Sequence, residues 1–356
     1  MGSITGLGSH FQSELPLHPK AAEFLDEAFS GGWASPAKIQ QPSRRTARLL
    51  NEAKEIFAHR LDLNLDEIHF LGDTPLAFHL GISGLLAPAG RVFYPQTARS
   101  MAYAVAHSHP NQMIPVDSHG LWQVPSPESG ANDQDLFVWQ EVNPETGVKV
   151  PASQEFVGKI FVDAVNSHEP ISHPWHGAIW DSRAWQGPAG LSLFALKRSA
   201  EWTNPLPHND TKPTSGNFSI PLTVASAIAL ESYAAEYTEA TSHLAALNQQ
   251  VRKFVAEHFP GGHVAATSDI AMPHLITFTI PGVDSQWLVN ELDRRGISVD
   301  TGSACISMNM QPSHVLAAMG LPVTGNIRLR LRADHSEAEL HLLLRAVKEV
   351  SDQFLA

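Results

Sequence analysis

The chain is short of cysteine and of basic residues. It has one cysteine among 356 residues, so no disulfide can form within the chain, and we expect a reducing compartment, the cytoplasm. Lys and Arg number 24 against 36 Asp and Glu, which gives a formal net charge of -12. Binding to nucleic acid or to an anionic membrane requires a positive surface, so this charge argues against both. We expect small molecules or proteins as partners.

The sequence also lacks long apolar runs. Nowhere do 18 apolar residues follow one another, so no membrane-spanning helix is expected. Residues 1–20 do not join a basic stretch to an apolar one, which excludes the pattern of a signal peptide. The glycines in this region do not follow a strand, so they fail the context test for a dinucleotide-binding motif.

Helical and strand patterns alternate through the first two thirds of the chain. Residues 42–61 repeat apolar positions at helical spacing, with Ser43 as the expected N-cap, and residues 75–86 form a second helix. Strands separated by helical stretches predict an α/β fold with a mostly parallel sheet covered on both faces. The expected strands are 67–72, 91–95, 112–116, 136–142, 159–165, 177–181 and 191–196.

The remaining residues change in character. Residues 221–259 predict a long helix, which we expect to break or bend where it leaves the sheet. From 274 to 350 short strands, including 297–305 and 327–334, alternate with amphipathic helices. We therefore expect a large α/β domain over 15–240 and a small α+β domain built from 1–14 and 241–356.

Five segments carry a specific resemblance. Residues 291–321, "ELDRRGISVDTGSACISMNMQPSHVLAAMGL", are similar to the cysteine desulfurase segment that holds the sulfur-accepting cysteine, here Cys305. The loop "VNPETGVKVP" resembles the family's Asn-Asn-Glu loop, and "DAVNSH" resembles its Asp-Ala-x-Gln-Ser strand end. The other two are "DSRAWQGPAGLSLFALKR" and "EIHFLGDTPLAFHLGI". The chain thus resembles the class V aminotransferases, which are fold type I pyridoxal phosphate proteins.

The resemblance implies four site residues that match the family. Asp163 corresponds to the carboxylate that holds the pyridine nitrogen protonated, and Thr74 to a phosphate contact at a helix N-terminus. Arg328 corresponds to the arginine that binds the substrate carboxylate, and Cys305 to the nucleophile. These four imply a pyridoxal phosphate site that takes an amino acid or another small carboxylate.

Seven positions depart from the family. Ala184 stands where the family has the lysine that forms a Schiff base with the cofactor, and none of the nine lysines lies between Lys159 and Lys197. The other six departures are Arg183 for histidine, Asp181 for a phosphate-binding serine, Arg99 for the stacking histidine, Pro144 for asparagine, Asn166 for glutamine, and Asn217 for a threonine that reaches from the neighbouring subunit.

These departures differ in their consequences. A carboxylate about 4 Å from a phosphate costs roughly 4 kcal/mol at an effective dielectric near 20, so Asp181 opposes phosphate binding. Arg99 and Arg183 can offset that repulsion. No neighbouring charge, however, replaces a missing primary amine.

Several residues also have structural interpretations. Cys305 suits a small core position as well as a functional thiol, and Asp163 suits a carboxylate that caps a loop. Arg328 alternates with Arg330 and Arg332, which predicts either a solvated edge strand or an anion site. The close histidines, His107, His109, His168, His173 and His176, lack a completing ligand motif, so no metal site is expected.

Two hypotheses remain. In the first, the protein is a desulfurase-shaped homodimer without ordinary cofactor chemistry, a pseudoenzyme that binds or regulates a true desulfurase or a sulfur-transfer protein. In the second, it is an enzyme in which pyridoxal phosphate, pyridoxamine phosphate or another anionic ligand fills the pocket. Arg183 or Cys305 then transfers a proton or sulfur. The resemblance alone implies the homodimer.

Overall fold

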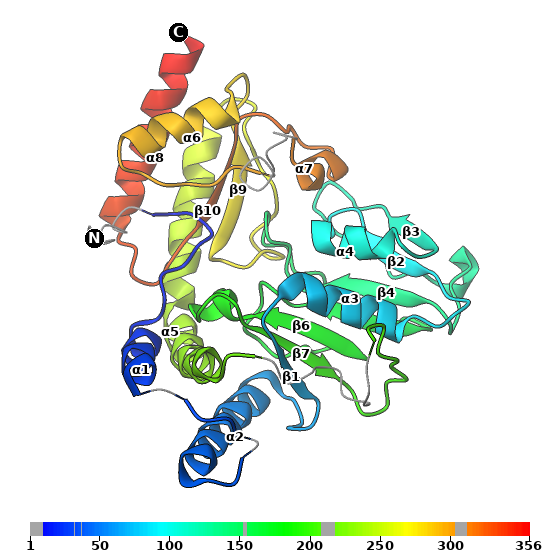
Figure 1. The fold of residues 1–356 in the computed structure, drawn as a ribbon. Coiled ribbons are helices and arrows are strands. Elements are labelled where there is room, and N and C mark those ends of the chain that lie inside the picture. The colour runs from blue at the N-terminus through cyan, green and yellow to red at the C-terminus, as the bar shows by residue number, and fades with distance from the viewer. Residues whose placement is uncertain (1–9, 32, 37, 152–154, 208–217, 303–311) are drawn as a thin grey trace.

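The computed structural model describes residues 10–31, 33–36, 38–151, 155–207, 218–302 and 312–356 (Figure 1). A seven-stranded sheet with the order β1-β7-β6-β5-β4-β2-β3 forms the larger part of the molecule. β7 runs antiparallel to both of its neighbours, β1 and β6, and the other strand pairs of this sheet are parallel, so the predicted mostly parallel sheet is confirmed. The strands are β1 (Ile68–Leu71), β2 (Val92–Pro95), β3 (Asn111–Ile114), β4 (Leu136–Gln140), β5 (Lys159–Asp163), β6 (Gly177–Asp181) and β7 (Ser192–Leu196).

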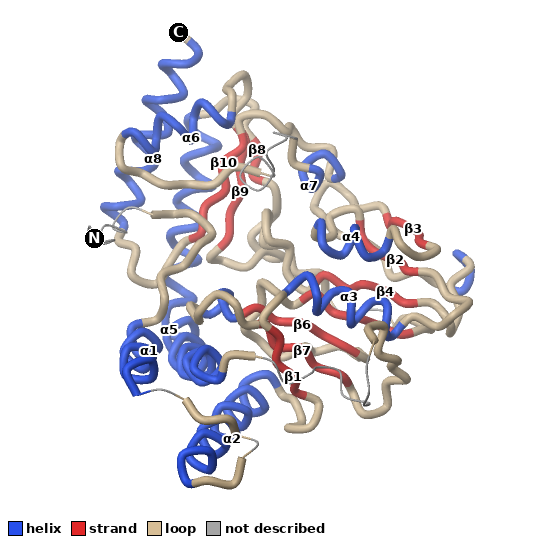
Figure 2. Tube along the Cα trace, viewed as in Figure 1, coloured by secondary structure: helices blue, strands red, loops and turns tan. Residues whose placement is uncertain are grey.

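Helices cover both faces of this sheet (Figure 2). Its central strands are therefore buried on both sides. On one face lie α3 (Thr74–Leu85) and α4 (Ser100–Ala106), which share a core with residues from β4 to β7. On the other lie α1 (Pro19–Gly31), α2 (Gln41–Leu61) and the first part of α5 (Ile220–His258). The parallel strands therefore end at an edge flanked by both helical layers, where sites of α/β proteins are built.

A three-stranded antiparallel sheet, with the order β10-β9-β8, forms the second part of the molecule. Its core also contains the second half of α5 and the N-terminal Phe11. Its elements are β8 (His263–Val264), β9 (Leu275–Thr279), β10 (Asn326–Arg330), α6 (Ser285–Arg294), α7 (His314–Ala318) and α8 (Glu337–Leu355). Among the described residues, no helix is both long and apolar enough to cross a membrane.

The long helix predicted over 221–259 is confirmed as α5 (Ile220–His258), which runs unbroken for 39 residues and packs into both cores. Two other local predictions were wrong. The N-cap of α2 is Gln40, because Pro42 already occupies the first turn and Ser43 is buried inside the helix. The described part of 297–305 forms isolated bridges in place of a strand, one of which joins Asp300 to Arg328. The boundary at residue 240 stays a prediction.

Candidate active site

The first cluster of the site lies at the carboxyl end of β5. Asp163 ends this strand with its side chain 2% exposed, and Arg99 is the N-cap residue of α4. Arg99 Nε lies 3.2 Å from Asp163 Oδ2, and Arg99 Nη2 donates to Asn166 Oδ1 at 2.8 Å. The other oxygen of Asp163 accepts the backbone N–H of Val165. Three of the predicted site residues, Arg99, Asp163 and Asn166, are thus brought together, and their polar groups pair with one another.

The second cluster lies at the end of β6. Asp181 Oδ2 accepts from the Thr74 hydroxyl at 2.8 Å and from Arg183 Nη2 at 2.7 Å, while its Oδ1 accepts from Arg183 Nε at 2.9 Å. Burial alone would raise the pKa of Asp181, but the hydrogen bonds and charge of Arg183 hold it below its usual value. The bidentate pair therefore keeps a charged carboxylate against the Thr74 hydroxyl.

The amino end of α3 carries a carboxylate of its own. Asp73 is the N-cap, and its Oδ1 accepts from the backbone N–H of Leu76 at 2.7 Å. Thr74 also lies 2.7 Å from the Ser192 hydroxyl. The groups that the sequence assigned to a bound phosphate thus have partners within the chain.

The third cluster joins β10 to the segment after α6. Arg328 Nη2 lies 3.4 Å from Asp300 Oδ2, which also accepts from the Ser13 backbone N–H at 2.6 Å and from the Ser13 hydroxyl. Arg328 and Arg330 are 8% and 6% exposed, so the solvated basic face considered for this strand is wrong. Arg328 Nε is buried without a hydrogen-bond partner in the described part of the chain.

Ala184 directly follows the second cluster in the sequence, in the short helix η2 (Ser182–Trp185), and is 5% exposed. Its carbonyl oxygen accepts from Arg330 Nη2 at 3.0 Å. Lys197, just after β7, pairs with Glu67 at 3.3 Å and lies over the Trp175 ring at 4.1 Å. Lys197 is the nearest lysine after Ala184 in the sequence, and it is held by Glu67 and Trp175, which belong to none of the three clusters.

Cys305 and Asn217 lie outside the described residues. The segment before Cys305 is fixed by Gly302, whose backbone N–H donates to Asn326 Oδ1 at 2.5 Å. The segment after it is fixed by Ser313, whose hydroxyl donates to Glu145 Oε2 at 2.5 Å. Sequence reasoning missed Asp300 as a site residue, although it stands five positions before Cys305 in the quoted motif.

The close histidines have separate partners. His173 lies 3.1 Å from Glu141, His176 accepts from the backbone N–H of Ile160, and His109 bonds to Ser83. His168 packs against the rings of Tyr233 and Tyr237. The described residues contain no group of three or more His, Cys, Asp or Glu side chains that could hold a metal ion.

Comparisons with known proteins agree on one relationship. The family model described as Aminotransferase class-V matches residues 198–343. The cysteine desulfurase IscS of Clostridium botulinum is 22% identical over 94% of this chain and 91% of its own. A NifS/IcsS protein homolog of Lactobacillus delbrueckii is 25% identical over 95% of both chains. A solved structure titled NIFS-LIKE PROTEIN has a TM-score of 0.85 at 19% identity and covers 97% of this chain and 99% of that one.

The fold is that of the fold type I pyridoxal phosphate proteins. Within this fold, the chain is similar to the cysteine desulfurases over nearly its whole length, and the class V aminotransferase model matches part of it.

Proposed function

We propose that this protein has the shape of a cysteine desulfurase without its Schiff-base chemistry, and that it acts as a binding or regulatory protein. One observation carries the proposal: the three arginines assigned to anion binding each pair with a carboxylate of the chain itself. The pairs are Arg99 with Asp163, Arg183 with Asp181, and Arg328 with Asp300. The charges that would bind a cofactor and an amino acid are thus paired with other charges of the same chain.

The residues present do not fit pyridoxal phosphate as a covalently held group. Asp163 would have to leave Arg99 to reach a pyridine nitrogen, and a phosphate beside Thr74 would meet the Asp181 carboxylate. Two like charges at such a distance repel by several kcal/mol at an effective dielectric near 20. Ala184 has no amine. We therefore derive no reaction step through the cofactor.

We infer the binding partner of the protein from its similarity to the cysteine desulfurases. We propose a homodimer that meets either a true desulfurase or a sulfur-transfer protein, since a protein with the family's shape can occupy the place of a catalytic subunit. The cytoplasm is the compartment we propose, on the basis of the single cysteine.

The decisive experiment is to incubate the purified protein with pyridoxal phosphate, reduce it with borohydride, and determine the intact mass with peptide mapping. We expect no stoichiometric adduct and no change in melting temperature. A full adduct on one lysine would overturn the proposal.

A second measurement distinguishes a non-catalytic protein from the enzymatic alternative. The protein is incubated with pyridoxal phosphate and cysteine, and sulfide release is followed in the wild type and in Cys305→Ser. We expect no turnover in either. Turnover that is lost in Cys305→Ser would instead make Cys305 a sulfur-accepting nucleophile, and turnover that survives it would exclude that role while still refuting a non-catalytic protein.

A further inference from the structure

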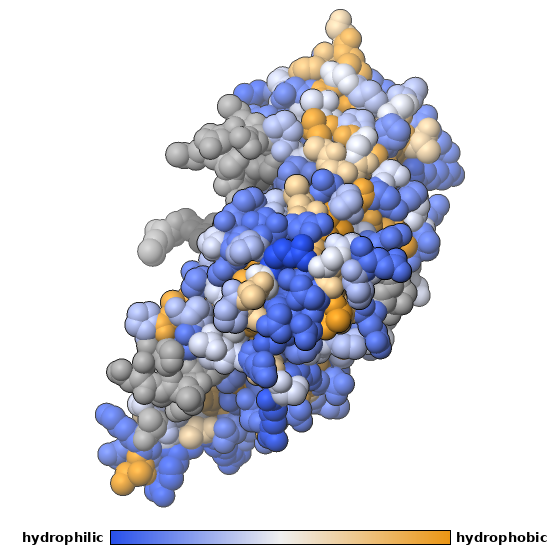
Figure 3. All heavy atoms as spheres, turned by 90° about the vertical axis from the view of Figure 1, so that its right-hand side faces the viewer, coloured by the Kyte–Doolittle hydropathy of each residue, from blue (hydrophilic) through white to orange (hydrophobic). Residues whose placement is uncertain are grey.

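The outer surface and the cavities of the molecule suit different kinds of partner. On the face of the molecule that Figure 3 shows, apolar residues lie in separate patches among hydrophilic ones. Stable protein interfaces have a continuous buried core of apolar side chains. That face therefore favours no partner protein, and a small ligand in a cavity is the stronger candidate for a further site.

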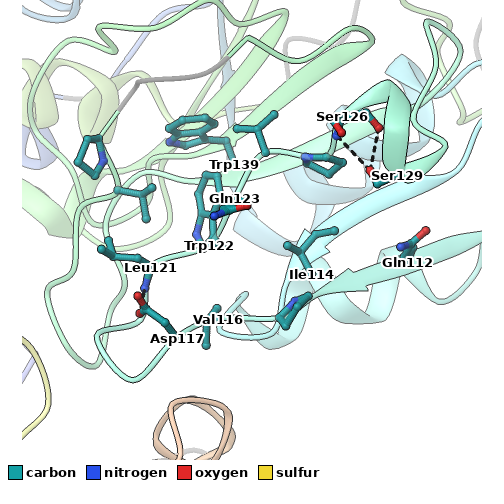
Figure 4. Close-up of a pocket in the computed structure, with 15 residues that line it drawn as sticks. Gln112, Ile114, Val116, Asp117, Leu121, Trp122, Gln123, Ser126, Ser129 and Trp139 are labelled. Carbon is teal, nitrogen blue, oxygen red and sulfur yellow. Dashed lines mark hydrogen bonds between the residues drawn. The ribbon is translucent and has the colours of Figure 1, made fainter.

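A cavity of about 750 Å³ lies beside the segment after β3 (Figure 4). Figure 4 shows Trp122 and Trp139 side by side in its wall. These two residues are only 6% and 1% exposed, so a ligand in the cavity would contact little of their rings. We therefore assign this cavity no ligand.

A smaller cavity, of about 270 Å³, lies where the two parts of the molecule meet. The N-terminal segment forms one wall, the middle of α5 forms a second, and the segment after β10 forms a third. The volume is close to the lower limit of about 300 Å³ for drug-sized ligands, so it suits a molecule with a single ring. The lining shares no residue with the three ion-pair clusters.

The N-terminal wall of this cavity is fixed at both ends. At one end the carbonyl oxygen of Phe11 accepts from the backbone N–H of Arg330 at 2.7 Å. At the other end the backbone N–H of His18 donates to the carbonyl oxygen of Gln186 at 2.8 Å. Between these anchors Pro16 restricts the backbone further, because its ring fixes φ. The wall is thus formed before a ligand arrives, which lowers the entropic cost of binding.

The cavity presents accessible apolar surface. Leu15, Leu17 and Tyr233 line it and are each partly exposed, so a ligand can contact them. The ring of Tyr233 lies 5.8 Å from that of Tyr237 at 26° and 5.1 Å from that of His168 at 86°, which holds it in place. A ring of the ligand can therefore pack against a fixed aromatic side chain and two leucines.

The rim of the cavity is acidic. The charged side chains among its described lining residues are Glu236, Asp334 and Arg332, and Arg332 Nε donates to Asp334 Oδ1 at 2.8 Å. Glu236 is left without a cation from the lining. Its side chain is 54% exposed and its Oε1 lies 3.2 Å from His18 Nε2, while its Oε2 has no partner among the described residues. The uncompensated charge favours a cationic ligand and opposes a carboxylate.

From these contacts we propose that this cavity binds a small primary amine that carries one apolar ring. The ring packs against Leu15, Leu17 and Tyr233, and the ammonium group donates to Glu236 Oε2. Because the walls come from both parts of the molecule, the bound amine also joins these parts. The site lies apart from the three ion-pair clusters and does not depend on the proposed binding or regulatory role.

The test is calorimetric titration of the full chain, without pyridoxal phosphate, with phenethylamine and with hydrocinnamate, which carries the same ring and the opposite charge. We expect phenethylamine to bind at least about ten-fold more tightly than hydrocinnamate. Glu236→Gln and Tyr233→Leu should each weaken the binding of phenethylamine several-fold. Glu239→Gln, which changes an exposed acid of α5 outside the lining, is the matched control and should leave binding unchanged.

Three outcomes would overturn this assignment. They are no binding of phenethylamine at millimolar concentration, hydrocinnamate bound as tightly as phenethylamine, and binding that either folded variant leaves unchanged. Glu236 is exposed, so Glu236→Gln gives a result even where Tyr233→Leu does not fold. None of these outcomes bears on the Schiff-base experiment, since the titration contains no cofactor.

Discussion

The guanidinium of Arg99 lies against the carboxylate of Asp163, with Arg99 Nε 3.2 Å from Asp163 Oδ2. The carboxylate is 2% exposed and the arginine side chain 17% exposed, so the pair is largely removed from water. A buried carboxylate that already has a cationic partner does not require a second one, and separating the two leaves an unpaired charge. A ligand that uses Asp163 therefore has to displace Arg99 first.

The pairing predicts how the site responds to a restored lysine. Ala184→Lys alone should form little or no adduct with pyridoxal phosphate, because Arg99 and Asp181 still oppose the cofactor. Adding Asp181→Ser removes about 4 kcal/mol of repulsion, which is roughly a thousand-fold in affinity, and Arg99→His removes the guanidinium that occupies Asp163. We expect a stoichiometric borohydride-reduced adduct at residue 184 only in the triple variant.

Ala184→Gln in the same background is the control, since it fills a similar volume without an amine. A full adduct in the single Ala184→Lys variant would show that the ion pairs do not obstruct the site. An adduct on another lysine in the triple variant would contradict the assignment of position 184.

Breaking the pair at Asp163 from one side should destabilise the fold. Arg99→Ala leaves a buried carboxylate without its cation, and we expect a loss of about 3 kcal/mol in the free energy of unfolding, measured with urea. The double variant Arg99→Leu with Asp163→Leu should recover most of that loss. Arg48→Ala, which breaks the pair of Arg48 (81% exposed) with Glu52 (47% exposed), should cost less than about 1 kcal/mol. An equal loss in the single and double variants would refute a specific pairing.

The sequence predicted the sheet and most elements well, because the central strands are continuous apolar runs and the helices carry clear periodicity. It did not predict the ion pairs. Asp300 and Arg328 are 28 positions apart on different elements, and only the packing of β10 beside the segment after α6 joins them. Ser43 failed as a cap because Pro42 fits the first helical turn, which moved the start of α2 back to Gln41.

The free energy of unfolding at low pH should show how the charge of Asp181 stabilises the fold. Its pKa in the folded protein lies below the ordinary value of 3.8, so its contribution is complete above that value and is lost as the pH falls through the lower, folded value. We expect Asp181→Asn to reduce the free energy of unfolding near neutral pH. The difference from the wild type should shrink as the pH falls below about 3.8.

The measurement is urea unfolding of both proteins over that range, with Asp133→Asn as an exposed control. A difference that stays constant with pH would mean that the charge of Asp181 is not what stabilises the fold.

His168 should make the protein sensitive to mild acid. Burial lowers the pKa of its imidazole from 6.5 to about 4, because the ring packs against Tyr233 and Tyr237 away from water. Between these two values the unfolded chain takes up a proton that the folded chain excludes, so stability decreases as the pH falls from 6.5 toward 4. Each pH unit corresponds to about 1.4 kcal/mol.

His168→Phe keeps an aromatic ring against the tyrosines and removes the titration, so its unfolding free energy should change less over this range than that of the wild type. His107→Phe, at an exposed position, is the matched control and should leave the pH dependence as it is. The residual slope in His168→Phe then reports the other histidines whose pKa burial lowers, which are His69, His109, His176, His274 and His335. Parallel pH profiles for the wild type and His168→Phe would show that His168 is protonated in the folded protein.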